Sequence, residues 1–152
     1  MTSTTQRSQV HSTFQLERTY RAPRELVWAA FADADAKRRW FGGGDDTELS
    51  DDFRVGGHQV SAGTLPDGPT YRYRSTYTDL LDGERIVATY DMWLDDAHIS
   101  TSITTITLED DPDGTHVTWT EQGVHLDGHD TGAEREHGTG ELMDALGASL
   151  PH

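Results

Sequence analysis

Apolar residues recur at every second position along most of this chain, which is typical of strands that bury one face. Residues 12–20 form the first such segment. Six more follow, mostly separated by Gly-, Asp- and Pro-containing turns, over residues 47–55, 58–65, 71–78, 85–93, 98–108 and 115–124. Because most of the later connections have the length of hairpin turns, we expect a single antiparallel sheet.

Helical spacing interrupts this alternation after the first strand and again at the end of the chain. Pro23 and Glu25 suit a first helical turn, because proline needs no N–H partner there and a carboxylate favours the helix dipole. A second short helix is predicted over residues 34–40 and a long one over residues 134–150. The long helix carries an apolar stripe of Leu142, Met143, Leu146 and Leu150. A curved sheet needs such a stripe to cover its concave face.

The length of 152 residues fits one domain with its own core. Residues 1–11 are polar and lack the apolar stretch of a secretory signal, so we expect a flexible tail before a single domain at 12–152. No run approaches the roughly 20 apolar residues of a membrane span. Zero cysteines exclude disulfides, thiolate zinc sites and a cysteine nucleophile. A cytoplasmic location is the default expectation.

The chain is strongly acidic, with 27 Asp and Glu against 12 Lys and Arg and a formal net charge of −15. Nucleic-acid binding requires a large basic surface, so that function class is excluded. We expect no membrane partner either. A homodimer is compatible with the composition, although no heptad pattern specifies an interface.

Five motifs occur in a fixed order along the chain. They are Phe14–Arg21 followed by Ala22-Pro23 and Val27-Trp28, Trp40-Phe41-Gly42-Gly43, Asp52-Phe53-Arg54-Val55-Gly56-Gly57, Thr120-Glu121-Gln122-Gly123, and Leu126-Asp127-Gly128 with Arg135-Glu136-His137-Gly138-Thr139. In this order they resemble the START-like helix-grip superfamily, also called SRPBCC. Within it the chain is most similar to the bacterial branch related to the activator of the ninety-kilodalton heat-shock chaperone's ATPase.

This resemblance implies an α+β, Bet v1-like fold. A curved antiparallel sheet of about seven strands surrounds a long C-terminal helix, and two short helices follow the first strand. The resemblance also implies an internal cavity. Many members of the broader family place a tryptophan directly after the glycine of the last helix, where this chain has Thr139.

Aromatic and apolar residues of the strands and helices are the first candidates for lining such a cavity. They suit a flat or apolar ligand, although the same residue types also build the core wherever a sheet packs on a helix. The candidates are Phe31, Trp40, Phe41, Phe53, Tyr71, Tyr73, Tyr77, Tyr90, Met92, Trp119, Leu142, Met143 and Leu146.

Glu121 is the one candidate for acid–base chemistry. It shares strand parity with Val117 and Trp119, so its side chain should point inward. A carboxylate in an apolar cavity has a raised pKa and serves as an acid, a base or a ligand anchor. The alternative is a structural ion pair with Arg54 or Arg74.

Histidines and carboxylates cluster near the start of the last helix. His125, His129 and His137, with a neighbouring carboxylate, have the ligand types of a zinc or nickel site. Their spacing is unspecific, and a solvated loop with a helix cap explains the composition equally well. We therefore expect no metal and no cofactor.

These observations favour a protein that binds a small apolar or aromatic molecule. The first alternative is a cyclase, dehydratase or hydrolase acting on a polyketide-like or aromatic substrate, with Glu121 as acid or base. The second, motivated by the resemblance, is a cofactor that interacts with a chaperone.

Overall fold

The computed structural model describes residues 6–41 and 48–151. Within these residues seven strands form one antiparallel sheet in the order β1-β7-β6-β5-β4-β3-β2. The strands are β1 (Gln9–Tyr20), β2 (Glu48–Asp51), β3 (His58–Thr64), β4 (Thr70–Leu81), β5 (Arg85–Leu94), β6 (Ala97–Asp111) and β7 (Gly114–Leu126). The helices are α1 (Arg24–Ala32), α2 (Ala34–Arg38) and α3 (Gly132–Ser149).

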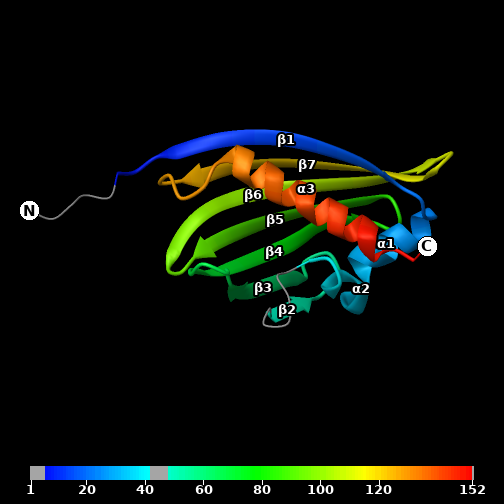
Figure 1. The fold of residues 1–152 in the computed structure, drawn as a ribbon, viewed down its shortest axis with the longest axis horizontal. Coiled ribbons are helices and arrows are strands. Elements are labelled where there is room, and N and C mark those ends of the chain that lie inside the picture. Colours follow the sequence, from blue (N-terminus) through cyan, green and yellow to red (C-terminus); the bar gives the residue numbers. More distant parts are fainter. Residues whose placement is uncertain (1–5, 42–47, 152) are drawn as a thin grey trace, which may run out of the picture.

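The curved sheet and the long last helix confirm the predicted helix-grip fold. Figure 1 shows α3 lying across the sheet and ending beside α1. The first strand pairs with the last along its whole length, from Gln9 opposite Leu126 to Tyr20 opposite Thr115. Alternating buried and exposed residues in β6 and β7 place one side-chain row of each strand on the concave face beneath α3.

Polar caps set the starts of two helices. Asp33 accepts hydrogen bonds from the backbone N–H groups of Asp35 and Ala36 and so begins α2. Thr131 Oγ1 accepts a hydrogen bond from the Glu134 N–H, 3.1 Å away. The long helix α3 therefore begins at Gly132, two residues before its predicted start.

The predicted flexible tail is wrong at its C-terminal end, since β1 begins at Gln9. Just before the strand, Arg7 forms an ion pair with Asp127 at 3.0 Å, and the Ser8 N–H donates to the same carboxylate. Asp127 has a φ of 59° in the turn after β7, which positions its side chain for both contacts. Because residues 9–11 are mostly polar, the hydrophobic pattern did not indicate that they pair with β7.

The second strand is also shorter than predicted, because residues 52–57 form a close turn. Gly56 has a φ of 85°, a conformation that favours glycine. A Cβ atom at Gly57 would lie 2.0 Å from the Asp52 carbonyl oxygen. The predicted motif residues Gly42 and Gly43 lie outside the described residues.

A packed core fills the end of the fold where α1, α2 and the last turns of α3 meet the sheet. Side chains from α1, from α3 and from five strands lie together there. The fully or almost fully buried members include Val27, Phe31, Tyr77, Val117, Met143 and Leu146. In the part of the chain described, no helix has both the length and the apolar character that crossing a membrane requires.

Candidate ligand-binding cavity

A cavity of about 480 Å³ lies between the concave face of the sheet and the first half of α3. Its walls come from strands β3 to β7, from the loop before α3 and from α3 itself. Most of the lining is aliphatic or aromatic, and charged side chains gather where α3 begins. A volume of this size lies in the range of small-molecule sites.

Aromatic rings line the sheet side of the cavity. The rings of Tyr73 and Tyr90 lie 4.6 Å apart between centroids, and Phe41 packs edge-on against Tyr73 at 5.3 Å. Tyr73 and Tyr90 come from the neighbouring strands β4 and β5, which alternate so that both side chains reach the concave face. Contacts of this kind hold the rings in fixed positions and give the cavity a preformed wall.

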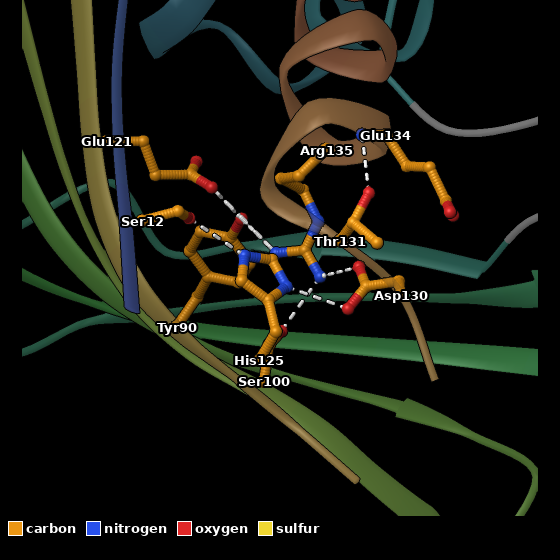
Figure 2. Close-up of polar contacts among 9 residues, drawn as sticks. All are labelled: Ser12, Tyr90, Ser100, Glu121, His125, Asp130, Thr131, Glu134 and Arg135. Carbon is orange, nitrogen blue, oxygen red and sulfur yellow. Dashed lines mark hydrogen bonds and ion pairs between the residues drawn. The ribbon is translucent and has the colours of Figure 1, made fainter. Parts of the chain in front are cut away.

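A polar cluster lies at the end of the cavity where α3 starts (Figure 2). The Tyr90 hydroxyl donates to Glu121 Oε2 at 2.7 Å, and Thr104 Oγ1 donates to Glu121 Oε1 at 3.3 Å. Arg135 reaches from α3 to the same point. Its Nη1 donates to the Tyr90 hydroxyl at 2.7 Å and lies 3.8 Å from the Glu121 carboxylate.

Arg135 also links this cluster to the loop before α3. Its Nη2 donates to Ser100 Oγ at 2.8 Å and to Asp130 Oδ2 at 2.7 Å. Asp130 in turn lies 2.7 Å from Nδ1 of His125, whose Nε2 lies 3.1 Å from Ser12 Oγ. The chain of contacts therefore fastens the start of α3 to β1, β6 and β7.

Burial is the main cause of the pKa shifts of two groups on the cavity wall, Glu121 and Tyr90. Burial raises the pKa of the Glu121 carboxyl, although hydrogen bonds from Tyr90 and Thr104 and the charge of Arg135 oppose the rise. The pKa of the Tyr90 hydroxyl is raised well above its ordinary value by burial and by the Glu121 charge. Tyr90 is therefore a neutral donor at physiological pH, and Glu121 is a carboxyl that takes up a proton more readily than an exposed one.

The structure separates the sequence-predicted cavity residues into two groups. Eight of them line the cavity, namely Phe41, Tyr71, Tyr73, Tyr90, Met92, Trp119, Glu121 and Leu142. The other six lie only in or against the packed core, namely Phe31, Trp40, Phe53, Tyr77, Met143 and Leu146. Phe41, Trp119 and Leu142 contact both the cavity and the core. The division follows position along the concave face, because the core occupies one end and the cavity the other.

The suggested ion-pair partners of Glu121 are wrong. Arg54 pairs with Asp52 at 2.8 Å, and Arg74 is exposed. The cationic neighbour is Arg135 of α3. Helical spacing could have indicated it, since Arg135 lies one turn before Thr139 and two before Leu142, both of which line the cavity.

Sequence reasoning also missed several smaller lining residues. Ser61, Ile99 and Thr104 come from strands, whereas Gly138 and Thr139 come from the face of α3 that looks onto the sheet. Serine, threonine and glycine carry little signal in a hydrophobic pattern, so alternation alone does not single them out.

The three candidate metal-binding histidines do not converge. His125 is buried against Asp130, His129 lines the cavity, and His137 pairs with Glu141 on the outer side of α3. The described residues contain no group of three or more His, Cys, Asp or Glu arranged to hold a metal ion.

A second buried charge lies outside the cavity, beneath α2. The ammonium of Lys37 donates to Gln59 Oε1 at 2.9 Å and to the Tyr77 hydroxyl at 3.1 Å, and lies 3.5 Å from Asp51. Burial lowers the pKa of Lys37 to about 8 against the opposing charge of Asp51. This cluster connects α2 to strands β2, β3 and β4 of the sheet.

Comparisons with known proteins agree with this fold. An uncharacterised protein of Rhizobium leguminosarum is 36% identical over 96% of this chain and 98% of its own, with a TM-score of 0.91. The protein Mll3558 of Rhizobium loti is 44% identical over 94% of this chain and 99% of its own, with a TM-score of 0.88.

The AHSA1-like protein of Aeromonas hydrophila shares the fold at 20% identity, with a TM-score of 0.64 over 91% of each chain. No protein with a curated functional description matches the chain. The sequence profile described as "Activator of Hsp90 ATPase homolog 1-like protein" matches residues 21–150, which is most of the sequence. The chain therefore belongs to the family of Activator of Hsp90 ATPase homolog 1-like proteins.

Proposed function

We propose that this protein binds a small apolar or aromatic molecule in the cavity beneath the first half of α3. The observation that carries the proposal is the cavity itself, about 480 Å³ in volume and walled largely by aromatic and aliphatic side chains. The core lies at the other end of the sheet, so the fold does not need to fill this space to be stable. The family's fold is consistent with a ligand-binding type of domain.

Polar side chains at one end of the cavity add a further requirement. Glu121, Asp130 and Arg135 line the cavity there, whereas most of the remaining wall is aliphatic or aromatic. A small number of polar groups in an apolar pocket fixes the orientation of a ligand. We therefore expect an apolar body with at least one polar atom.

The test is to close the cavity without disturbing the core. A Cβ atom added at Gly138 meets nothing within 4 Å, and Gly138 lines the cavity. Gly138→Trp should therefore place its ring in the cavity. With Nile red, a neutral apolar dye, as the fluorescent probe, we expect saturable binding to the parent and at least roughly tenfold weaker binding to this variant, since a filled site loses its contact area.

Gly140→Trp is the matched control for this experiment. Gly140 lies two residues along α3, in a separate surface groove beside β1, and its added Cβ would lie 3.5 Å from Arg18. The control should keep the affinity of the parent. A parent that binds no dye, or a dye affinity that both variants lower equally, would contradict the proposal.

A second candidate function, hydrolysis or cyclisation of an aromatic substrate, follows from Glu121. This carboxyl lines the cavity, its pKa is raised by burial, and Tyr90 donates a hydrogen bond to it. A group of this kind suits general acid–base catalysis. Hydrolysis of 4-nitrophenyl butyrate that disappears in Glu121→Gln, while Nile red still binds, would support it. Equal hydrolysis by parent and variant would exclude a role for Glu121.

A further inference from the structure

The walls of the cavity carry more negative than positive charge. Among the residues that the structure describes, Glu121, Asp130 and Glu134 line the cavity together with one fixed cation, Arg135. Three carboxylates against one guanidinium leave a formal charge of −2 at pH 7, with His129 counted as neutral. The protein as a whole carries −15. The field at the cavity therefore favours cations and opposes anions.

Arg135 is already engaged, which removes the cation that would otherwise anchor an anionic ligand within the described part of the wall. Nη1 of Arg135 donates to Tyr90, and Nη2 donates to both Ser100 and Asp130. The guanidinium also lies 3.8 Å from Glu121. A ligand carboxylate would have to displace an internal partner and would then lie beside two buried carboxyl groups, which repel it.

Glu134 differs from the other two carboxylates. It is exposed at the rim of the cavity, and in the residues described its carboxylate has neither a hydrogen bond nor an ion pair. Figure 2 shows its side chain turned away from the Arg135 cluster. Glu134 is therefore an unpaired carboxylate at the cavity mouth, next in sequence to Arg135, whose positive charge is already paired with Asp130 and Glu121.

The aromatic walls are also suited to a positive group. Ring faces attract cations within about 6 Å. The cavity already shows this contact, because the Arg135 guanidinium lies 5.6 Å from the centroid of the Tyr90 ring. Tyr71 and Tyr73 extend the same wall.

We infer that the ligand is an apolar or aromatic amine, held with its body among the aromatic rings and its ammonium group at the cavity mouth beside Glu134. This inference rests on the proposed function, because it names the class of molecule that the same cavity takes. It predicts an order of affinity in which a positively charged ligand binds more tightly than its neutral counterpart and a negatively charged one binds least.

The test uses three probes that share one ring system, 2-naphthylmethylamine, 2-naphthylmethanol and 2-naphthoate. Calorimetric titration at pH 7 and about 0.15 M salt suppresses long-range attraction to the acidic surface. We expect the amine to bind about tenfold more tightly than the alcohol, because its ammonium group gains one cation–π contact with the aromatic wall and one ion pair with Glu134. The carboxylate should bind at least threefold more weakly than the alcohol.

Glu134→Gln should lower the amine-to-alcohol affinity ratio at least threefold. Glu136→Gln removes the same charge from the outer side of α3, where Glu136 lines the separate groove, and should leave the ratio unchanged. An equal fall in both variants would overturn the placement beside Glu134. An alcohol or carboxylate that binds as tightly as the amine would overturn the inference, while the proposed function would stand. Failure of all three probes to bind would overturn both.

Discussion

The two halves of α3 serve different purposes, although they form one continuous helix. We call residues 132–142 the cavity half and residues 143–149 the core half. The cavity half presents Arg135, Gly138 and Thr139 to the cavity. The core half buries Met143 and Leu146 completely, at 0% exposure each.

The difference shows how one helix can combine a stable fold with an internal space. The glycines illustrate it most directly. A Cβ atom at Gly138 would meet nothing within 4 Å, whereas one at Gly147 would lie 2.9 Å from the Tyr20 ring. Small residues leave room in the cavity half and permit close packing in the core half. Stability and ligand capacity should therefore respond to different substitutions.

The largest expected effect comes from truncating the core half. Met143→Ala and Leu146→Ala should each lower the free energy of unfolding by about 2–5 kcal/mol, because both side chains are fully enclosed. Leu142→Ala should lower it by less than about 2 kcal/mol, since that side chain lines the cavity and lacks partner atoms on one side. Urea unfolding followed by circular dichroism measures all three.

Equal losses at positions 142, 143 and 146 would remove the distinction between the halves. They would show that Leu142 is as tightly packed as its neighbours, and the space beneath the cavity half would then not exist in solution. Nile red titration of the same variants provides a second measure, because only Leu142→Ala should change dye affinity.

A smaller effect of opposite sign is expected at the two glycines. Gly147→Ala should lower stability by about 1 kcal/mol, because overpacking against the fixed Tyr20 ring outweighs the gain in helix propensity. The Tyr20 hydroxyl donates to the Met143 carbonyl at 2.7 Å, so the ring cannot easily move aside. Gly138→Ala should raise stability by about 0.5–1 kcal/mol, since its methyl group enters open space. Thermal and urea unfolding would reveal the signs, and stabilisation by both substitutions would contradict tight packing at Gly147.

The fold was largely predictable from the sequence, because alternation and helical spacing are local patterns. Alternating residues in β6 and β7 and the stripe from Leu142 to Leu150 indicated the sheet and the helix that covers it. The errors lie where pairing overrides composition. Residues 9–11 look like a tail, yet they pair with β7 because the turn at Asp127 holds Arg7 and Ser8 in place.

The site was only partly predictable, because a hydrophobic pattern does not distinguish a wall from a core. Tyr73 and Tyr77 share one face of β4, yet Tyr73 lines the cavity and Tyr77 lies in the core. The difference arises because α1 and α2 cover the end of the sheet where Tyr77 lies. This is a tertiary contact, which a local sequence pattern does not predict. The partner of Glu121 was missed for the same reason, since Arg135 meets it only when α3 crosses β7.

The smallest expected effect is a pH dependence of stability that comes from Glu121 of β7, which lines the cavity together with the cavity half of α3. Burial raises the pKa of Glu121 in the folded protein above its value in the unfolded chain. Between the two pKa values the folded state holds more protons, so this group's contribution to stability is fully present below the ordinary pKa and is lost as pH rises through the raised one. Gln at this position cannot titrate. The stability of the parent relative to Glu121→Gln should therefore fall as pH rises above about 4.5 and then become constant.

Urea unfolding of the parent and Glu121→Gln across pH 4–8 measures this difference, with Glu136→Gln as the control for an exposed carboxylate. A difference that instead increases with pH would mean that Arg135 and Tyr90 stabilise the Glu121 anion more than burial destabilises it. Glu121 would then be a permanently charged partner of Arg135. In that case an ion pair would hold the start of α3 in place, whereas apolar packing holds the core half. The two halves of the helix would then differ in the kind of contact that fixes them as well as in how tightly they are packed.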